Sequence, residues 1–318
     1  MSPFRILFVS DLHGSESGFR KFINSVPTYR PDLLIYGGDL LGKTLVPVFP
    51  AGPDQYRWYP NGKTAVTFSD KERAGVERQI ADQGRYSYVV DPPRWAELQR
   101  EPAALESICI GLARERLRRW LGLVRERLEP SGLPVIMNVG NDDPDEILDL
   151  LRAEAPRNVL IPEAKIVTVA DYEIFGCGYA NMTPWHCPRD LPEAELQRVL
   201  EKTSSTLGDP RKTIFDIHAP PADTALDLAP QLDADLRPRT ASGEMLLTHV
   251  GSPSVRALIE RVQPMLSLHG HIHESRAVDR LGATPIFNPG SVYFSGQMQG
   301  LLVELDGSEV RSHLFVTG

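Results

Sequence analysis

Cysteine is scarce in this sequence of 318 residues, in which only Cys109, Cys177 and Cys187 occur, without CxxC spacing. An odd, sparse set of this kind excludes a disulfide framework and favours a reducing compartment. Long apolar runs are also missing, because no stretch approaches the roughly 20 residues that a membrane helix needs. The first residues lead into a strand-like segment without the pattern of a signal peptide. We therefore expect a cytoplasmic protein that does not enter a membrane.

Basic residues are outnumbered, since 34 Lys and Arg against 42 Asp and Glu leave a formal net charge of −8. This balance argues against a broad basic surface for long nucleic acid. It does not exclude a small phosphorylated substrate, because bound metal ions would reverse the local field. Apolar residues make up 42% and charged residues 24%, the balance of an ordinary globular protein.

Short apolar runs alternate with amphipathic helical patterns along most of the chain. Residues 4–10 form a β-rich run, residues 19–26 place four apolar side chains on one helical face, and residues 32–36 form a second run. This β-α-β order favours parallel strands that carry ligands at their carboxyl ends. The same alternation returns at residues 133–139, 212–217, 255–262 and 265–268. We therefore predict an α/β fold in a single domain of residues 1–318.

The alternation breaks between residues 43 and 131. This stretch opens with four prolines and with Tyr56, Trp58 and Tyr59, and it becomes helical most clearly over residues 112–128. We predict a largely helical insertion of approximately residues 43–131, which is a candidate cap or lid. Its aromatic residues form either a lid over the site or the small core of the insertion, and we favour the core. Arginines such as Arg116, beside the apolar stripe of the helix, are expected to cover that stripe rather than to bind phosphate.

Five of the apolar runs end in residues that can bind a metal ion. These residues are Asp11 and His13, Asp39, Asn141, His218, and His271 and His273. Each alone has an ordinary explanation as a turn residue or cap, but together they include four of the eight histidines, each after a predicted buried strand. Mixed oxygen and nitrogen donors suit divalent or trivalent first-row metals rather than a thiolate zinc site. Two such ions about 3.5–4 Å apart activate water and clamp a phosphoryl group, so phosphate ester hydrolysis is the natural chemistry.

The order of these motifs resembles the calcineurin-like metallophosphoesterase superfamily. The motifs are Asp11-x-His13, Gly38-Asp39, Gly140-Asn141-Asp142-Asp143, His218 and Gly270-His271-x-His273. The sequences of residues 218–221, 269–274 and 288–291 look most like those of the small prokaryotic Icc-related phosphoesterases. The resemblance covers the core but not the insertion. It implies a four-layer metallophosphoesterase sandwich, with two mixed β-sheets flanked by α-helices.

The resemblance also implies two metal ions and their ligands. One ion would be held by Asp11, His13, Asp39 and His273, and the other by Asp39, Asn141, His218 and His271, with Asp39 bridging. A metal-bridging hydroxide would then attack phosphorus in line with the leaving group. We favour manganese, although iron, nickel and zinc suit the same ligands.

Asp142 departs from the family pattern, in which many members have a histidine assigned to leaving-group protonation and substrate contact. A carboxylate cannot supply imidazolium charge, and it repels a dianionic phosphomonoester more than a monoanionic diester. The alternative is that Asp142 is only a turn or helix-start residue while another group, or water, protonates the leaving group. These two interpretations carry equal weight, so Asp142 is a candidate catalytic residue. His249, before Gly251, is a candidate substrate contact.

We predict a two-metal-dependent phosphoester hydrolase of small phosphorylated substrates, and we favour a phosphodiesterase. A phosphomonoesterase is the alternative within the same class. A catalytically silent binding module of the same fold would show missing ligands, and none is missing here. A nuclease is disfavoured by the acidic net charge.

Overall fold

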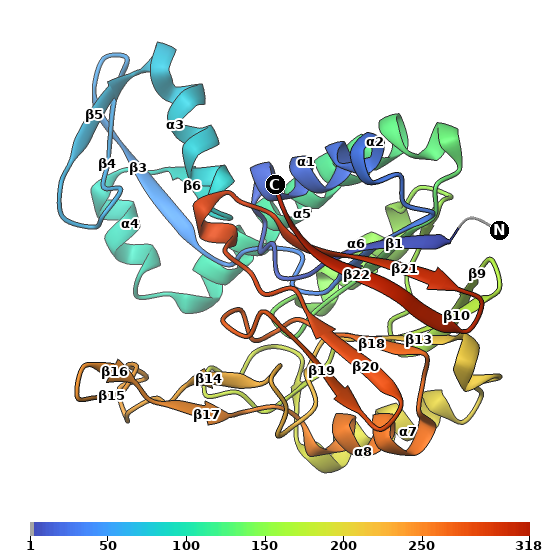
Figure 1. Cartoon of the computed structure of the whole chain (residues 1–318). Helices are drawn as coiled ribbons and strands as arrows, with labels where there is room; N and C mark the ends of the chain where they lie inside the picture. Colours follow the sequence, from blue (N-terminus) through green and yellow to red (C-terminus); the bar gives the residue numbers. More distant parts are fainter. Residues whose placement is uncertain (1–2) are drawn as a thin grey trace.

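A computed structural model describes residues 3–318 of the chain as two six-stranded mixed sheets stacked between layers of helices (Figure 1). This arrangement confirms the four-layer sandwich. Among residues 3–318, no helix combines the length and the apolar character that crossing a membrane requires.

The first sheet contains the strand that opens the chain. Its strand order is β22 (Glu309–Thr317), β21 (Gln299–Asp306), β1 (Phe4–Val9), β2 (Leu33–Gly37), β7 (Val135–Asn138) and β8 (Val159–Leu160). The four strands from β1 to β8 are parallel, whereas β21 and β22 form the closing antiparallel hairpin. Its outer face is covered by α1 (Glu16–Asn24), α2 (Val26–Tyr29), α5 (Pro102–Arg127) and α6 (Asp145–Glu154), with the 3-10 turn η1 (Glu129–Ser131) after α5.

The second sheet has the same mixed character. Its order is β19 (Ala277–Leu281), β20 (Thr284–Asn288), β18 (Leu266–Leu268), β13 (Thr213–Ile217), β10 (Tyr172–Cys177) and β9 (Lys165–Val169). The four inner strands are parallel, and the two edge strands are antiparallel to their neighbours. Helices α7 (Glu193–Ser204) and α8 (Pro253–Val262) cover its outer face, and η2 (Pro210–Lys212) and η3 (Tyr293–Ser295) are short 3-10 turns.

The side chains of the central strands point alternately to the two faces of each sheet, and both faces are buried. In β1, Ile6 and Phe8 face the second sheet, while Leu7 and Val9 face the helices of the first layer. Successive side chains of a strand point to opposite faces, so a strand buried on both faces is apolar throughout. That is why these strands are continuous apolar runs in the sequence.

The insertion has a sheet of its own. Its strands β3 (Leu45–Gly52), β4 (Gln55–Trp58), β5 (Val66–Ser69) and β6 (Tyr86–Val89) lie in the order β5-β4-β3-β6, beside α3 (Asp70–Asp82) and α4 (Pro92–Leu98). Trp58 belongs to a small separate core with Val46, Val48, Phe68 and Ile80. The C-terminal half of α5 instead packs on the main core, where Trp120 stacks on Phe19 at 4.1 Å between ring centroids.

The prolines of β3 are tolerated because each half of this strand pairs on one side only. Residues 45–48 pair with β6, and residues 49–52 pair with β4. A proline cannot donate to a ladder, so it is normally confined to edge positions. Pro47 and Pro50 each sit where one side of the strand is open, and the sequence pattern therefore did not indicate a strand here.

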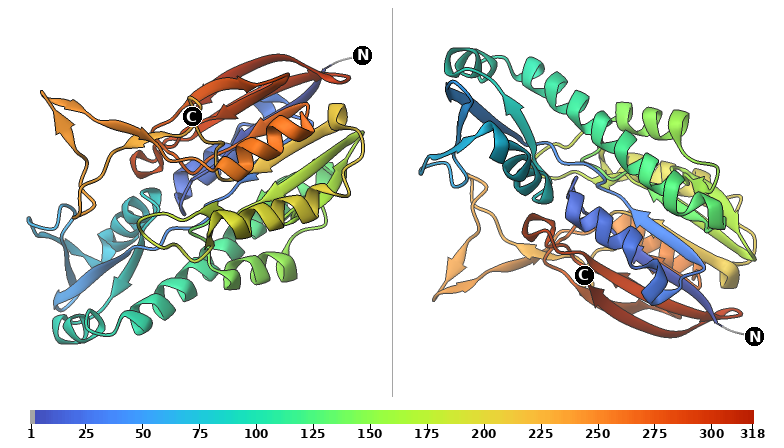
Figure 2. Two further views of the ribbon diagram at one scale, coloured as in Figure 1. Left: turned by 90° about the horizontal axis from the view of Figure 1, so that it is seen from below. Right: turned by 90° about the horizontal axis from the view of Figure 1, so that it is seen from above.

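A narrow arm, residues 228–249, leaves the second sheet on the same side of the sandwich as the insertion (Figures 1 and 2). It consists of β14 (Leu228–Pro230) paired with β17 (Leu247–His249) and, further out, β15 (Thr240–Ala241) paired with β16 (Glu244–Met245). Near its base, β11 (Ala180–Asn181) pairs with β12 (Asp190–Leu191).

Candidate metal centre

The motif residues meet where the central parallel strands of both sheets end. Asp11, Asp39 and Asn141 follow β1, β2 and β7 of the first sheet, and these three strands are neighbours. His218 follows β13 of the second sheet, and the His271 and His273 loop follows its neighbour β18. Because the carboxyl ends of adjacent parallel strands share an edge, residues distant in sequence converge there.

The backbone of these loops is held in an uncommon conformation. Asp11, His13, Asp39 and His271 have φ values of 56°, 41°, 50° and 68°. Non-glycine residues remain in the left-handed region only where the surrounding structure fixes them, and such residues cluster at functional sites. Here the N–H of Asp11 donates to the carbonyl of Gly38 at 3.0 Å, and the Asp11 carboxylate accepts from the N–H of His271 at 3.0 Å.

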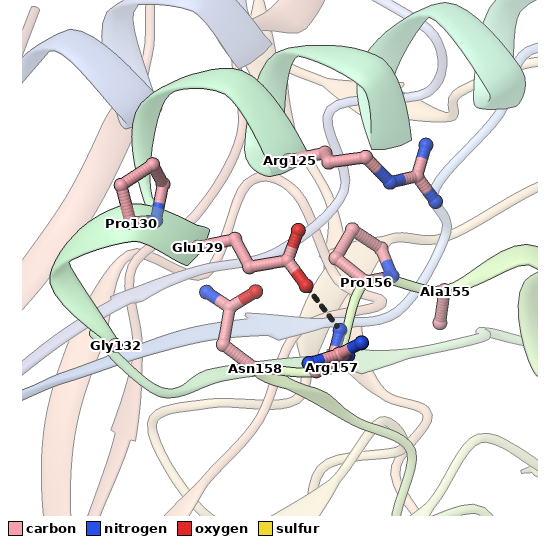
Figure 3. Close-up of a pocket in the computed structure, with 8 residues that line it drawn as sticks. All are labelled: Arg125, Glu129, Pro130, Gly132, Ala155, Pro156, Arg157 and Asn158. Carbon is pink, nitrogen blue, oxygen red and sulfur yellow. Dashed lines mark hydrogen bonds between the residues drawn. The ribbon is translucent and has the colours of Figure 1, made fainter.

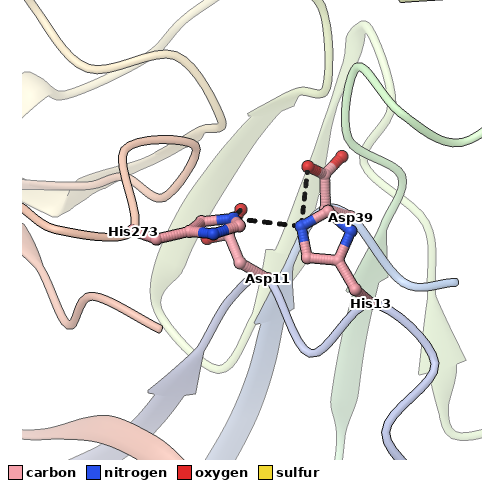
Figure 4. A group of neighbouring side chains, drawn as sticks. All are labelled: Asp11, His13, Asp39 and His273. Atoms are coloured by element: carbon pink, nitrogen blue, oxygen red, sulfur yellow. Dashed lines mark hydrogen bonds and ion pairs between the residues drawn. The ribbon is translucent and has the colours of Figure 1, made fainter. Parts of the chain in front are cut away.

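Four side chains form a compact group (Figure 4). One ligand atom from each of Asp11, His13, Asp39 and His273 lies within 4.8 Å of the others. His13 Nε2 lies 3.0 Å from His273 Nε2 and 3.4 Å from Asp39 Oδ2. His273 Nε2 lies 3.5 Å from Asp11 Oδ1. These are the four residues that the family resemblance assigned to one ion.

The remaining motif residues lie beside this group. His218 Nε2 is 3.4 Å from Asp39 Oδ2 and 3.8 Å from Asp11 Oδ1. His271 Nδ1 is 2.9 Å from Asn141 Oδ1, and the rings of His218 and His271 meet at 5.3 Å between centroids. All seven predicted ligands are thus brought to one place, and Asp39 lies between the two sets.

The donor atoms fit metal ions. Within residues 3–318, His218 Nε2 is buried without a hydrogen-bond partner although it faces two carboxylates. His13 and His273 direct ring nitrogens at each other at 3.0 Å, a pair that a metal ion can bind with both rings neutral. A buried polar atom without a partner is costly unless a ligand satisfies it. The group of Asp11, His13, Asp39 and His273 can therefore hold a metal ion.

The electrostatics of the site favour a cation. Burial opposes the charged form of Asp39, but the neighbouring His218 and His13 outweigh it and lower the pKa of this carboxyl. Burial likewise favours a neutral His218, yet Asp39 and Asp11 raise the pKa of its imidazole to about 10. Burial, together with the charge of His218, lowers the pKa of His271 to about 4. The carboxylates thus stabilise a positive charge between them. Here a protonated histidine carries that charge, and bound metal ions would replace it.

Asp143 has a role that the sequence did not indicate. Its position predicts the N-cap of α6, but the helix begins at Asp145 with Pro144 as the N-cap residue. The buried Asp143 carboxylate instead accepts from the N–H groups of Leu40, Leu41 and Gly140 at 2.8, 3.0 and 2.9 Å. It therefore ties the loop of Asp39 to the loop of Asn141. Burial and the charge of Asp39 raise the pKa of Asp143 to about 7.

Asp190 is a second supporting residue that sequence reasoning missed. Its Oδ1 accepts from Asn141 Nδ2 at 2.8 Å, which turns the amide oxygen of Asn141 toward His271. Partners of this kind orient metal ligands. Nothing in the local sequence around Asp190 signals this role, because it lies 49 residues from Asn141.

Asp142 borders the predicted ligands and is paired with a cation. Its N–H donates to Asp39 Oδ1 at 3.0 Å, and its carboxylate lies 3.8 Å from His13 Nδ1. Lys43, at the start of the insertion, donates to Asp142 Oδ1 at 2.7 Å. Burial acts to lower the pKa of Lys43, but Asp142 outweighs it and the pKa is raised. Lys43 was not singled out by its sequence context.

His249 is not brought to the centre. Its Nδ1 lies 2.7 Å from the buried carboxylate of Asp227, and nearly half of its side chain is exposed. Among the described residues, His249 is not one of those lining the cavity at the metal centre. Asp227 holds the ring at the base of the arm, so the role of His249 as a substrate contact stays a prediction that this position does not favour.

A cavity of about 1130 Å³ opens over the predicted metal ligands. It is lined by residues of the insertion, the metal loops, the segment 181–187 and the arm. A second hollow of about 870 Å³, lined by Arg125, Glu129 and Asn158 among others, lies before the starts of β7 and β8 (Figure 3). That hollow is at the amino ends of the strands, so it is remote from the predicted metal ligands.

Comparisons with known proteins agree with this fold. No family model matches the chain. The chain is 32% identical over 178 residues to uncharacterized protein MJ1162 of Methanocaldococcus jannaschii, a match covering 55% of this chain and 72% of that protein. The crystal structure of TT1561 of Thermus thermophilus is 14% identical with a TM-score of 0.53, over 100% of this chain and 99% of that one. Another crystal structure is 15% identical with a TM-score of 0.58, over 99% and 98% of the two chains.

The structural likenesses show the fold, and the likeness to MJ1162 shows kinship. The chain belongs to the family of MJ1162. Its four-layer sandwich is the fold that the resemblance to the calcineurin-like metallophosphoesterases implied. The fold implied by the resemblance noted in the sequence is thereby confirmed.

Proposed function

We propose that the chain is a metal-dependent phosphoric ester hydrolase that prefers phosphodiesters. The observation that carries this proposal is the position of Asp39 Oδ2, which lies 3.4 Å from both His13 Nε2 and His218 Nε2. One carboxylate oxygen thus faces a residue from each ligand set, as a bridging carboxylate requires. Two ions bound there supply an activated water and stabilise charge on the phosphoryl oxygens.

The proposed ligand sets are those that the family resemblance implies. Asp11, His13, Asp39 and His273 hold one ion, and Asp39, Asn141, His218 and His271 hold the other. The contact of 2.9 Å between His271 and Asn141 supports the second set. Asp190 and Asp143 keep the ligand loops in place through their hydrogen bonds. Manganese is the metal that we propose, and the donors also suit iron, nickel and zinc.

The preference for diesters rests on Asp142 and Lys43. A histidine at position 142 would offer imidazolium charge to the second negative charge of a phosphomonoester. The ion pair of Asp142 and Lys43, at 2.7 Å, carries no net charge and offers much less attraction to a dianion. Its Lys43 ammonium remains able to donate a hydrogen bond to a departing ester oxygen. These features support a monoanionic substrate and assign Asp142 to positioning Lys43.

A phosphomonoesterase is the second candidate. It is favoured by two cationic side chains, Lys43 and Arg85, that line the cavity on the side of the insertion. If Asp142 turned away from Lys43, these two cations would attract a dianionic phosphate.

Paired turnover of a chromogenic phosphodiester and the matching monoester, with manganese added, tests the proposal. We expect turnover of the diester with little of the monoester, and loss of activity in metal-stripped protein and in Asn141→Ala. Equal or faster turnover of the monoester would remove the diester preference and keep the hydrolase. No turnover of either ester by protein with two bound metal ions would overturn the hydrolase and favour a binding module.

A further inference from the structure

The cavity at the metal centre has two chemically different sides. On the side of the insertion it is lined by polar and charged residues, including Lys43, Thr44 and Arg85. On the side of the arm, polar residues such as Gln231 and Thr248 also line it, but most of its large apolar lining residues are here: Met182, Pro184, Trp185, Leu232 and Leu236. We call this second group the apolar wall. Insertion and arm project on either side of the metal loops (Figures 1 and 2).

Three side chains of the apolar wall are more exposed to solvent than large apolar residues usually are. Trp185 is 60% exposed, Met182 45% and Leu236 42%, although each is a large apolar side chain. Of eleven large apolar side chains that residues 3–318 leave exposed, five belong to the arm or to the segment 182–185. Clustered apolar groups that line a cavity beside convergent polar groups are typical of a ligand site.

The segment that carries Trp185 is fixed to the metal centre. Asp190 Oδ2 accepts from Thr183 N at 3.0 Å, from Thr183 Oγ1 at 2.5 Å and from Cys187 N at 2.9 Å. The other oxygen of the same carboxylate accepts from the metal ligand Asn141 at 2.8 Å. One carboxylate therefore sets both the orientation of Asn141 and the position of the loop around Trp185. A loose surface loop would not have this connection.

We infer that the apolar wall binds an aromatic or alkyl ester group of the phosphodiester substrate. This inference rests on the proposed function, and it names the substrate class of the same site. With phosphorus at the metal ligands, one ester group lies toward Lys43 and Arg85 and the other toward Trp185. Burying an apolar group against the wall removes it from water and stabilises the complex. A methyl ester gains little from this surface, whereas a hexyl or phenyl ester covers Trp185.

The test uses manganese-loaded full-length protein and nitrophenyl phosphodiesters whose second ester group is methyl, hexyl or phenyl. We expect kcat/KM for the hexyl and phenyl esters to exceed that for the methyl ester by about tenfold. In Trp185→Ala this ratio falls toward one. Leu314→Ala, which removes an exposed apolar side chain of β22 away from the cavity, keeps the ratio of the unchanged protein.

Calorimetric binding of hexylphosphonate and methylphosphonate separates this inference from the proposed hydrolase. We expect hexylphosphonate to bind about tenfold more tightly, with the difference lost in Trp185→Ala. If all three esters turn over equally and both phosphonates bind equally, the apolar wall has no substrate role although the hydrolase stands. If no ester turns over but hexylphosphonate keeps its advantage, the hydrolase fails and the apolar subsite stands. An advantage that is unchanged in Trp185→Ala overturns the assignment to this wall.

Discussion

Among single residues, Asp190 links the proposed metal centre to the loop that carries the apolar wall. Its two carboxylate oxygens accept from the proposed metal ligand Asn141 and from the loop of Thr183. An amide at this position keeps the size of the side chain but cannot accept at both oxygens. We expect Asp190→Asn to weaken metal binding by about 10–100-fold, as the loss of a ligand-orienting partner does. Competition with a chelating dye measures this affinity.

The matched control for this prediction is Asp171→Asn, which alters an exposed aspartate outside the site. It should leave metal affinity unchanged. Metal affinity that is equal in Asp190→Asn and the unchanged protein would contradict the orienting role of Asp190.

His249 provides a residue-scale test of pH dependence. Its hydrogen bond to Asp227 raises its pKa above the ordinary value of 6.5. A histidine whose pKa is raised by folding stabilises the native state below its unfolded pKa, and this stabilisation is lost as pH rises through the folded pKa. Because the ring is nearly half exposed, the effect is at most about 1 kcal/mol.

We therefore expect His249→Gln to lower the free energy of unfolding at pH 5.5 and to have a smaller effect at pH 9. Urea unfolding at the two pH values measures the difference. An equal loss of stability at both values would show that the ion pair with Asp227 does not contribute.

Among the elements, α5 is the one that joins the insertion to the sandwich. Its Arg116 is buried, although its neighbours in sequence predict an arginine that covers an apolar stripe from the surface. The guanidinium donates to the carbonyls of Gly14 and Arg85 at 2.7 and 2.9 Å and lies 4.3 Å from the centre of the Tyr86 ring. Arg116 thus fastens the loop after His13 to the insertion.

We expect Arg116→Met to lower the free energy of unfolding by about 2–4 kcal/mol, because two carbonyls lose their donor. Arg119→Met is the matched control, since Arg119 lies on the same helix and also contacts Glu16 but is mostly exposed. It should change stability by less than about 0.5 kcal/mol. Denaturant unfolding compares the two, and similar losses would contradict the buried role of Arg116.

For the whole molecule, metal binding and folding should be coupled, because the proposed ligands follow strands of both sheets. A ligand at 100 times its dissociation constant stabilises a native protein by about 2.7 kcal/mol for each site. We expect saturating manganese to raise Tm by about 5–10 °C in a chain of this size. Scanning calorimetry with and without a chelator measures the shift. Asp39→Asn should lose most of it, and a full shift in this variant would contradict the bridging position of Asp39.

Periodicity and residue type predicted much of this molecule. The apolar runs that end at Asp11, Asp39 and His218 are strands buried on both faces, and such strands are recognisable from composition alone. Asp11 and Asp39 follow neighbouring parallel strands, so their convergence follows from the order of elements. His218 follows a strand of the second sheet, and only the stacking of the two sheets brings it to them. The strand β3 was not predicted because it contains prolines. A strand tolerates them only where one of its sides is unpaired, and the pairing of each half of β3 is not visible in the sequence.

What the sequence by itself determined is the fold class, and it singled out the seven candidate metal ligands, because both depend on local pattern and on strand ends. What only the tertiary structure decided are the contacts between distant segments. Lys43 meets Asp142 across 99 positions, and Asp190 meets Asn141 across 49. No local pattern encodes such a pair, since each partner is an ordinary surface or turn residue until the sheets bring them together. The apolar wall has the same origin, because its two segments are neighbours only in the folded chain.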